Sequence, residues 1–389
     1  MEGSSVTFSF FLIFSGAALF ASLALYTRQP LIIAYIALGA CIGPYGLSLV
    51  TDLQLLSDIG HIGIIFLLFL LGLDMQPRAL FATLRQSTLT MVASSAVFLI
   101  ACAALALPFL PSRQDALVVG AAMMFSSTII GIKLLPTTVL HHRHIGEMMV
   151  GLLLLQDLLA IIVLMLLMAA GGDAVGPGAV TLSLLSLPLL AAGAWLAVRY
   201  LLLPLITRFD RFHEYIFLLA IGWCLGVAEV ARVAGLSEEI GAFIAGVTIA
   251  TSPIAQYIAG SLRPLRDFFL ILFFFAVGAR FDLGLLEQIL LPALLLGALV
   301  LAMKPTVYRY LLGGMSESRS LAWDLGFRLG QASEFSLLIA YIAVDLALVS
   351  PRASLLIQAT TIITLLASSY IVVLNYPTPI AISDRLRRD

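Results

Sequence analysis

Residues 151–168 read GLLLLQDLLAIIVLMLLM, and this stretch decides the class of protein. A span needs about 20 mostly apolar residues to cross the hydrocarbon layer of a bilayer, and this stretch with its flanks meets that requirement. Gln156 and Asp157 interrupt an otherwise apolar run. An ionisable side chain at membrane depth is costly and marks a functional site by default. The stretch therefore predicts a transmembrane helix that carries a functional acid.

The rest of the chain has the composition of a membrane protein. Of its 389 residues, 61% are hydrophobic and 11% are charged, and the mean hydropathy is +1.08. Soluble domains are about half apolar and about a quarter charged, so a soluble globular fold is excluded. The net charge of −1 provides no basic excess to neutralise phosphates, which excludes electrostatic binding of nucleic acid. The three cysteines have no metal-ligand spacing, and no cofactor is expected.

Apolar stretches of membrane-spanning length recur along the whole chain, so we expect an all-α polytopic membrane protein. We predict one membrane domain over residues 1–374 and a short polar tail over residues 375–389. The thirteen candidate spans are Val6–Tyr26, Pro30–Val50, Ile59–Asp74, Ser87–Phe109, Asp115–Leu135, Gly146–Ala170, Ala179–Leu203, Tyr215–Val233, Ser237–Ala250, Phe268–Ala279, Gln288–Leu311, Leu321–Val344 and Ala353–Leu374. The third, ninth and tenth are short, so we expect them to extend into their polar flanks.

The basic residues are distributed unevenly between the two sides that this span count defines. The chain has 21 Lys and Arg residues, of which fifteen fall on one side. Four fall on the other side, namely Arg113, Arg232, Arg280 and Arg352. The remaining two, Lys304 and Arg328, lie inside predicted spans. The positive-inside rule places the larger group in the cytoplasm. We therefore expect an external N-terminus and a cytoplasmic C-terminus.

Two halves of the chain repeat each other weakly. Gly39–Gly43 and Gly241–Gly246 are each followed by a Phe- and Leu-rich run that ends in an Asp, and the Gly72–Ser126 interval nearly equals the Gly278–Ser333 interval. We predict repeat one over about residues 6–170, a linker helix over about 179–203 and repeat two over about 215–374. An odd span between the repeats inverts the second, which is typical of secondary transporters. Chance similarity of Gly- and Phe-rich segments is the alternative.

Asp157 is the foremost functional candidate among the polar groups at membrane depth. A buried carboxyl group can hold a proton, and the same group when ionised is a hard oxygen ligand for a monovalent cation. That competition is the minimum chemistry of antiport. The alternative is a purely structural salt bridge between Asp157 and Lys304. Glu229 and Arg328 are secondary candidates, and Arg328 has Asp324 one helical turn away as a possible partner.

Two spans contain small and hydroxyl residues that would permit a break in the helix. The first has Ser126, Ser127 and Thr128, and the second has the run Gly330–Ser336, which contains Gln331, Ser333 and Glu334. Irregular backbone at membrane depth is tolerated only where it faces protein or a cavity. Two breaks in corresponding halves predict crossing half-helices, with Glu334 and Lys304 as counter-charges for their exposed N–H and C=O ends. The alternative is that these hydroxyls bond back to their own helices.

Several motifs together resemble the Kef-type branch of the monovalent cation–proton antiporters. They are GACIGPYG (39–46), FLLFLLGLDMQPRAL (66–80), SSTIIGIKLL (126–135), LLLLQDLLAII (152–162), GLSEEIGAFIAGV (235–247), RPLRDFFLILFFFAVGARFDL (263–283) and LGQASEF (329–335). The resemblance covers essentially the whole chain in the same order. It implies a homodimer in a bacterial inner membrane, whose protomers exchange K⁺ or Na⁺ for H⁺ by an elevator-like movement of a core against a scaffold.

The resemblance also assigns roles to particular residues. It implies that Asp157 binds the ion and the proton, that Gln156 is its neighbour, that Lys304 is the core lysine, and that Ser126, Ser127 and Thr128 line the first break. Electrogenic relatives look like they carry two adjacent acids where this chain has Gln156 and Asp157, so the resemblance favours electroneutral exchange. The related full-length systems resemble this chain but continue into a cytoplasmic nucleotide-binding regulatory domain, whereas this sequence stops before it, either because the natural protein is short or because the sequence is a fragment. Residues 256–261 contain no acid, so glutathione gating is not expected.

Three other functions are alternatives to antiport for a chain of this composition. A ligand-gated or leak-type cation channel would favour a continuous polar pore with repeated acid or carbonyl rings. A small-solute symporter on the same architecture would favour more aromatic and hydrogen-bonding groups near the breaks. An intramembrane enzyme is disfavoured, because no His–Glu metal pair and no Ser/Cys–His arrangement lies at membrane depth. The preferred partners are therefore a monovalent cation, K⁺ before Na⁺, together with H⁺ and membrane lipid.

Overall fold

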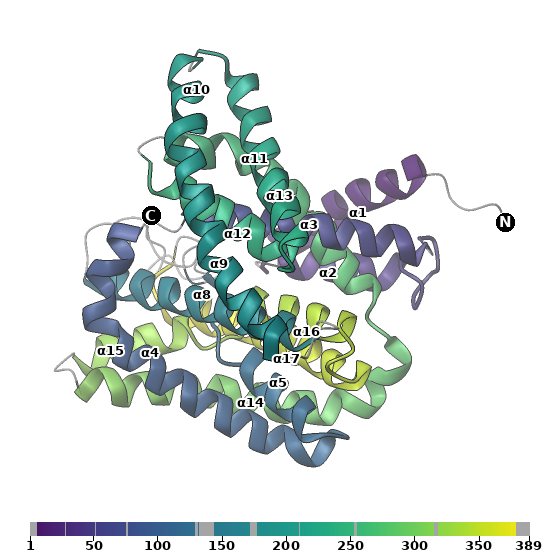
Figure 1. Cartoon of the computed structure of the whole chain (residues 1–389). Helices are drawn as coiled ribbons and strands as arrows, with labels where there is room; N and C mark the ends of the chain where they lie inside the picture. The colour runs from purple at the N-terminus through teal and green to yellow at the C-terminus, as the bar shows by residue number, and fades with distance from the viewer. Residues whose placement is uncertain are drawn as a thin grey trace. The chain divides into compact units, whose positions relative to one another are not determined.

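A computed structural model describes residues 6–27, 29–50, 52–74, 77–128, 131, 144–171, 177–209, 211–252, 255–314 and 318–378. Every element in these ranges is a helix (Figure 1), as the composition predicts. Among the described residues, seven helices are long and apolar enough to cross a membrane, and two shorter apolar helices accompany them. The all-α membrane fold is thus confirmed, whereas the count of thirteen spans stays a prediction. The tail beyond residue 378 lies outside the described residues.

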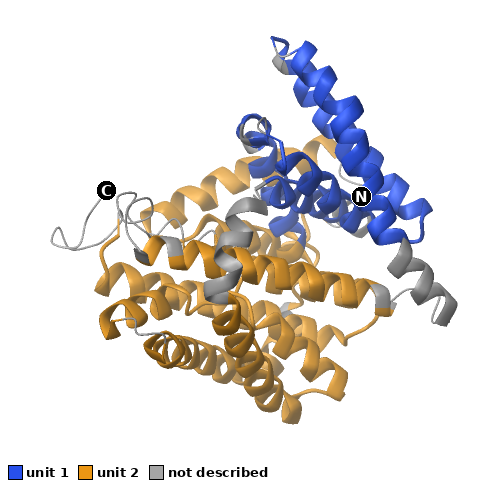
Figure 2. Ribbon diagram, turned by 60° about the vertical axis from the view of Figure 1, so that its left-hand side comes forward, with its two compact units in different colours: residues 1–3, 51–81, 172–276 blue, residues 4–50, 82–171, 277–389 orange. Residues whose placement is uncertain are grey.

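The described chain divides into two compact units (Figure 2). Unit 1 consists of residues 1–3, 51–81 and 172–276, and unit 2 consists of residues 4–50, 82–171 and 277–389. The helices of unit 1 are α3 (Leu53–Asp74), α9 (Pro177–Ala197), the π-helical turn η2 (Val198–Leu202), α10 (Leu203–Arg208), α11 (His213–Val233), α12 (Glu238–Ala250) and α13 (Ala255–Ala279), the last three residues of which belong to unit 2.

Unit 2 contains the helices whose sequences hold the polar candidates. They are α1 (Val6–Tyr26), α2 (Leu31–Ile42), most of α4 (Pro77–Ala106), the 3₁₀ turn η1 (Leu107–Phe109), α5 (Arg113–Ala122), α8 (His144–Gly171), α14 (Leu283–Gly314), α15 (Arg319–Arg328), α16 (Glu334–Asp345) and α17 (Pro351–Asn375). The single-domain organisation remains a prediction, as does the inverted repeat.

The helix boundaries differ from the predicted spans at several ends. α3 begins at Leu53 and α13 at Ala255, so both extend into polar flanks as expected. The expected extension of the ninth span is wrong, because α12 (Glu238–Ala250) is capped at its start by Ser237. α2 ends at Ile42, eight residues before the predicted end of its span, because Gly43–Val50 forms turns. The predicted span over Leu321–Val344 is two helices, α15 and α16, with non-helical backbone between them.

In unit 1, helices α3 and α12 pack with their backbones in close approach. A methyl group at Gly246 would lie 2.1 Å from the carbonyl oxygen of Phe69, and one at Gly72 would lie 2.5 Å from the carbonyl oxygen of Phe243. No side chain other than hydrogen fits at either position. This is the small-residue packing by which membrane helices associate without a hydrophobic driving force between them. The glycines singled out by the repeat thus have a packing role.

Candidate ion-binding site

The first helix break follows α5 in unit 2. Ser112 caps the start of α5 by accepting a hydrogen bond from the Asp115 backbone N–H at 3.0 Å. The helix ends at Ala122, Phe125–Ser127 are non-helical, and helical backbone resumes at Thr128. Ser126 and Ser127 are fully buried. The polar backbone of the break therefore lies inside the protein, as irregular backbone at membrane depth must.

The second break separates α15 from α16. Helix α15 ends at Arg328, Gly330–Ser333 are non-helical, and α16 starts at Glu334. Ser333 caps α16 by accepting from the Phe335 backbone N–H at 3.2 Å, while the Ser336 hydroxyl accepts from the Ser333 N–H at 3.2 Å. This reciprocal capping satisfies N–H groups that the helix start would leave without partners.

The two breaks are joined to each other by side chains. The Ser126 hydroxyl donates to the carbonyl oxygen of Leu329 at 2.8 Å, and the Ser336 hydroxyl donates to that of Ala122 at 2.6 Å. The Gln331 amide nitrogen lies 3.5 Å from the Ser127 carbonyl oxygen. These hydroxyls therefore connect separate helices, which differs from the alternative in which they bond back to their own helix.

Lys304 on α14 lies between the broken ends. Its side chain is fully buried, and its ammonium group donates to the carbonyl oxygens of Phe125 at 2.5 Å and Gln331 at 2.8 Å. The Ser126 hydroxyl oxygen is 3.3 Å away. The C-terminal end of a helix carries a partial negative charge on its carbonyl oxygens, so a cation at the ends of interrupted helices is electrostatically favourable. Lys304 thus bonds one residue from each break.

Gln156 on α8 forms a hydrogen bond with the backbone of the first break. Its side-chain oxygen accepts from the Ser126 backbone N–H at 3.0 Å, and its amide nitrogen donates to the Tyr308 hydroxyl at 2.7 Å. Tyr308 is fully buried one turn after Lys304 on α14. Both ends of the Gln156 amide therefore have a partner, which a buried polar side chain requires.

Asp157 lies beside the same break and is 3% exposed. The Thr128 hydroxyl is 3.2 and 3.3 Å from its two carboxylate oxygens. Within the described part of the chain, no basic side chain forms an ion pair with it; Lys304 is bonded to the carbonyl oxygens instead. An ionised carboxylate buried without a cationic partner is strongly disfavoured, so this group needs a proton or a bound cation.

The remaining predicted residues have other surroundings. Arg328 donates to the Asp324 carboxylate at 2.7 Å and to the Pro377 carbonyl oxygen at 2.9 Å, so it forms the pair that the spacing predicts, although its side chain is buried. Glu334 lies in the first turn of α16 and within electrostatic reach of Asp157. Glu229 belongs to unit 1, where its exposed side chain pairs with Arg232. Its exposure removes it from the buried candidates.

Comparison with known proteins identifies the family. Residues 11–374 match the family model described as sodium/hydrogen exchanger, transmembrane. The chain belongs to this family. The resemblance to the monovalent cation–proton antiporters noted in the sequence is thereby confirmed.

Curated relatives and a solved structure agree with the family assignment. The chain is 28% identical to K(+) efflux antiporter 6 of Arabidopsis thaliana over 87% of this chain and 58% of that protein. It is 27% identical to the iron transporter MagA of Paramagnetospirillum magneticum over 88% and 79%, respectively. It is 30% identical to the glutathione-regulated potassium-efflux system protein KefC of Salmonella newport over 83% and 53%. The chain thus spans only part of the length of these relatives.

The fold is shared with a sodium proton antiporter, MjNhaP1 from Methanocaldococcus jannaschii. The two structures superimpose with a TM-score of 0.67, 18% identity and coverage of 92% of this chain and 94% of that chain. At this identity the likeness concerns the fold.

Several residues of the site carry no signal that the sequence analysis used. Tyr308, Ser336, Thr364 and Ser368 all join the break network: Thr364 accepts from the Ala332 N–H at 3.1 Å and Ser368 donates to the Gln331 side-chain oxygen at 2.9 Å. Tyr308 follows Lys304 by four residues, which places both on one helix face. That spacing was the available signal. The signal for Thr364 and Ser368 on α17 was that each places a hydroxyl group in an apolar span.

Proposed function

We propose that this member of the family exchanges a monovalent cation for H⁺ across the membrane, and that Asp157 is the group that binds the two in turn. The observation that carries the proposal is the buried carboxylate of Asp157, which faces a helix break and has no ion-pair partner among the described basic residues. Protonation removes its charge, and a bound cation neutralises it. One buried acid thus excludes simultaneous binding of both ions.

The oxygens around Asp157 are suited to a hard monovalent cation. The carboxylate and the Thr128 hydroxyl converge from α8 and the first break, and break backbone is a source of further carbonyl oxygens. K⁺ is proposed before Na⁺ because the curated relatives include plant K(+) efflux antiporters and the KefC proteins. Ser126 and Ser127 are proposed to line the break that the ion enters.

Lys304 and Gln156 are proposed to hold the geometry rather than to carry the ion. Lys304 bonds carbonyl oxygens of both breaks, and Gln156 bonds Ser126 and Tyr308. At the second break, Gln331 and Ser333 are proposed to act in the same way through their hydrogen bonds, and Glu334 through its negative charge in the first turn of α16. Because Gln156 is neutral, only Asp157 exchanges charge at this position, which supports electroneutral exchange of one cation for one proton.

The larger assembly is part of the same proposal. We infer thirteen spans in two inverted repeats whose discontinuous helices cross, a homodimer, and alternating access by movement of a core against a scaffold. The basic-residue asymmetry supports a bacterial inner-membrane orientation with the N-terminus outside. A regulatory domain or subunit outside this chain is proposed from the length of the relatives.

The proposal is tested by transport in proteoliposomes that contain an internal pH dye. Outward gradients of K⁺, Na⁺, Li⁺ and Rb⁺ are imposed in turn, with and without an ionophore that clamps the voltage. Antiport predicts proton movement that K⁺ drives best and that the voltage clamp does not alter. Cation flux without coupled proton movement would instead indicate a channel, and proton movement that changes with voltage would refute electroneutrality.

A further inference from the structure

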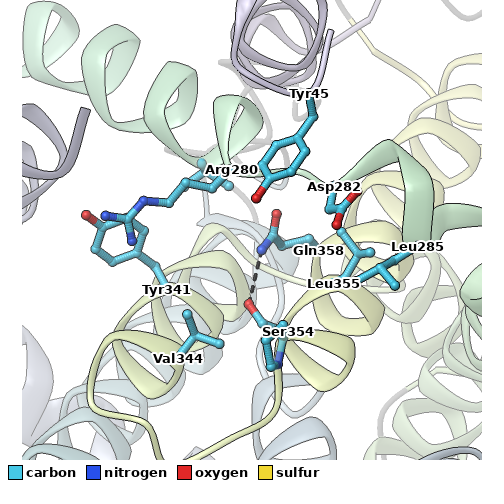
Figure 3. Close-up of a pocket in the computed structure, with 11 residues that line it drawn as sticks. Tyr45, Arg280, Asp282, Leu285, Tyr341, Val344, Ser354, Leu355 and Gln358 are labelled. Carbon is cyan, nitrogen blue, oxygen red and sulfur yellow. Dashed lines mark hydrogen bonds between the residues drawn. The ribbon is translucent and has the colours of Figure 1, made fainter. Parts of the chain in front are cut away.

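A polar pocket lies in unit 2 between the end of α13, the start of α14, the end of α16 and the start of α17 (Figure 3). Its volume is about 110 Å³. The polar residues that line it are Tyr45, Arg280, Asp282, Tyr341, Ser354 and Gln358. None of them belongs to the two breaks or contacts Asp157 in the bonds described above. The pocket is therefore a separate feature from the proposed exchange site.

Gln358 is the residue that points to a ligand. It is 7% exposed, and its amide nitrogen donates to the Ser354 hydroxyl at 3.1 Å, which in turn donates to the Ala340 carbonyl oxygen at 3.0 Å. Its side-chain oxygen has no hydrogen-bond partner among the described residues and faces the same space as the Tyr45 hydroxyl (Figure 3). A buried acceptor without a donor is costly, so an occupant of this space that is positive or donates hydrogen bonds is favoured.

The charges around the pocket favour a positive occupant. The Asp282 carboxylate lines the pocket, and one of its oxygens caps α14 by accepting from the Gly284 N–H at 2.8 Å. No bond to its other oxygen is found among the residues that the structure describes. The Arg280 guanidinium is turned over the Tyr341 ring, 4.4 Å from its centroid, and lies 3.5 Å from an Asp345 carboxylate oxygen. The Arg280 guanidinium thus pairs with Asp345, which leaves the Asp282 carboxylate at the pocket without a cationic partner among the described residues.

The oxygens available to an occupant are the Gln358 amide oxygen, the Asp282 carboxylate and the Tyr45 hydroxyl. This is a set of hard oxygen ligands with a single carboxylate, whereas Ca²⁺ sites use more carboxylates and Mg²⁺ demands octahedral geometry. Since water occupies about 30 Å³ in the liquid, the cavity has room for an ion with about two or three waters. An anion would meet the Asp282 carboxylate and the Gln358 oxygen.

We propose that this pocket binds a partly hydrated monovalent cation at a site distinct from Asp157. Such binding would act on α17, which carries Gln358 at the pocket and, further along, Thr364 and Ser368 bonded to the second break. The pocket thus shares a helix with the exchange machinery. The inference does not depend on the proposed role of Asp157.

The test measures thermal unfolding of the full chain in detergent, with Asp157→Asn as the background so that the exchange site is inactive. Choline is replaced by K⁺ or Rb⁺ at constant ionic strength. A ligand that binds only the folded protein raises the unfolding midpoint with concentration. We expect K⁺ to raise the midpoint in the background and to lose that effect when Asp282→Asn or Gln358→Leu is added.

Matched controls separate binding from folding defects. Asn remains a good helix cap, so Asp282→Asn keeps α14 capped and removes only charge. Glu287→Gln removes an exposed carboxylate on the same helix and should keep the K⁺ response. Gln358→Leu removes the buried acceptor that lacks a donor and also the amide N–H that donates to Ser354, so its K⁺ response is judged against its own midpoint in choline.

Three results would overturn the proposal. The Asp157→Asn protein could show no K⁺-dependent shift, or the shift could survive both pocket variants, or it could follow the anion when chloride is replaced by gluconate. Each of these leaves the role of Asp157 untouched. Failure of that role would be seen separately, as coupled exchange that persists in Asp157→Asn proteoliposomes.

Discussion

Replacing Lys304 tests how the two breaks are held together. Its ammonium group donates to the carbonyl oxygens of Phe125 and Gln331, and its side chain lies over the Phe98 ring, 5.5 Å from the centroid. A hydrogen bond to a charged group contributes about 1.5–3 kcal/mol. Lys304→Met leaves both carbonyl oxygens buried without a donor, so we expect a loss of about 3–5 kcal/mol. Lys304→Gln retains an N–H donor and should lose about 1–3 kcal/mol.

These losses are measured as unfolding midpoints of the purified protein in detergent. At about 2–4 °C per kcal/mol, Lys304→Met should unfold roughly 6–20 °C earlier than the wild type, and the midpoint of Lys304→Gln should lie between the two. Arg319→Met removes an exposed positive charge from α15 and serves as the control with little expected change. The Gln variant should retain some coupled exchange, because the proposed ion-binding acid is intact.

Two outcomes would refute this reasoning. A Lys304→Met protein as stable as the wild type would show that the carbonyl bonds contribute little to stability. A folded Lys304→Gln protein without any exchange, under every pH and cation gradient, would show that the lysine takes part in transport itself.

Three further predictions address packing, the break and orientation. Gly246→Ala should lower the free energy of unfolding by about 1–3 kcal/mol, because the added methyl group meets the Phe69 carbonyl oxygen. Gly222→Ala is the control and should cause no loss, because nothing lies within 4 Å of its added methyl group. Equal unfolding midpoints for the two variants would contradict the packing account. Ser126→Ala removes the hydrogen bond to the Leu329 carbonyl oxygen, so it should lower the exchange rate and reduce the free energy of unfolding by about 1–2 kcal/mol. Ser22→Ala removes an exposed hydroxyl that bonds its own helix and should change neither quantity. An unchanged exchange rate in Ser126→Ala would refute the role of the bond between Ser126 and Leu329. A cysteine at Ser4 should react with an impermeant reagent in intact cells, and labelling only after lysis would reverse the proposed orientation.

Much of the helical layout could be predicted from the sequence, because apolar length is a direct consequence of bilayer thickness. Helix α1 has the predicted bounds, Val6–Tyr26. The breaks were signalled by Ser, Gly and Gln within apolar spans, and the structure has non-helical backbone at both. The end of α2 was less predictable, since the turns that follow it depend on tertiary packing that hydropathy does not report.

The partners of the buried polar groups could not be predicted from spacing alone. Lys304 had two candidate partners, the Asp157 carboxylate and the carbonyl oxygens of the breaks, and only the three-dimensional path of the chain separates them. Tyr308 was missed because an aromatic residue on an apolar helix face looks like packing until its hydroxyl is seen beside Gln156. The pocket at Gln358 was missed for a similar reason, since its lining comes from four separate parts of the chain.

The central claim is that Asp157 alternately binds a proton and a monovalent cation. Its most direct measurement is cation-driven proton movement in proteoliposomes that contain equal amounts of wild-type, Asp157→Asn and Asp157→Glu protein. Asn keeps the shape of the side chain and removes the ionisable group, so that protein should fold yet show no coupled exchange, and Glu should retain part of the exchange with an altered pH dependence. Proton movement in Asp157→Asn at a near wild-type rate, driven by a K⁺ or Na⁺ gradient, would contradict the claim and direct attention to Glu334.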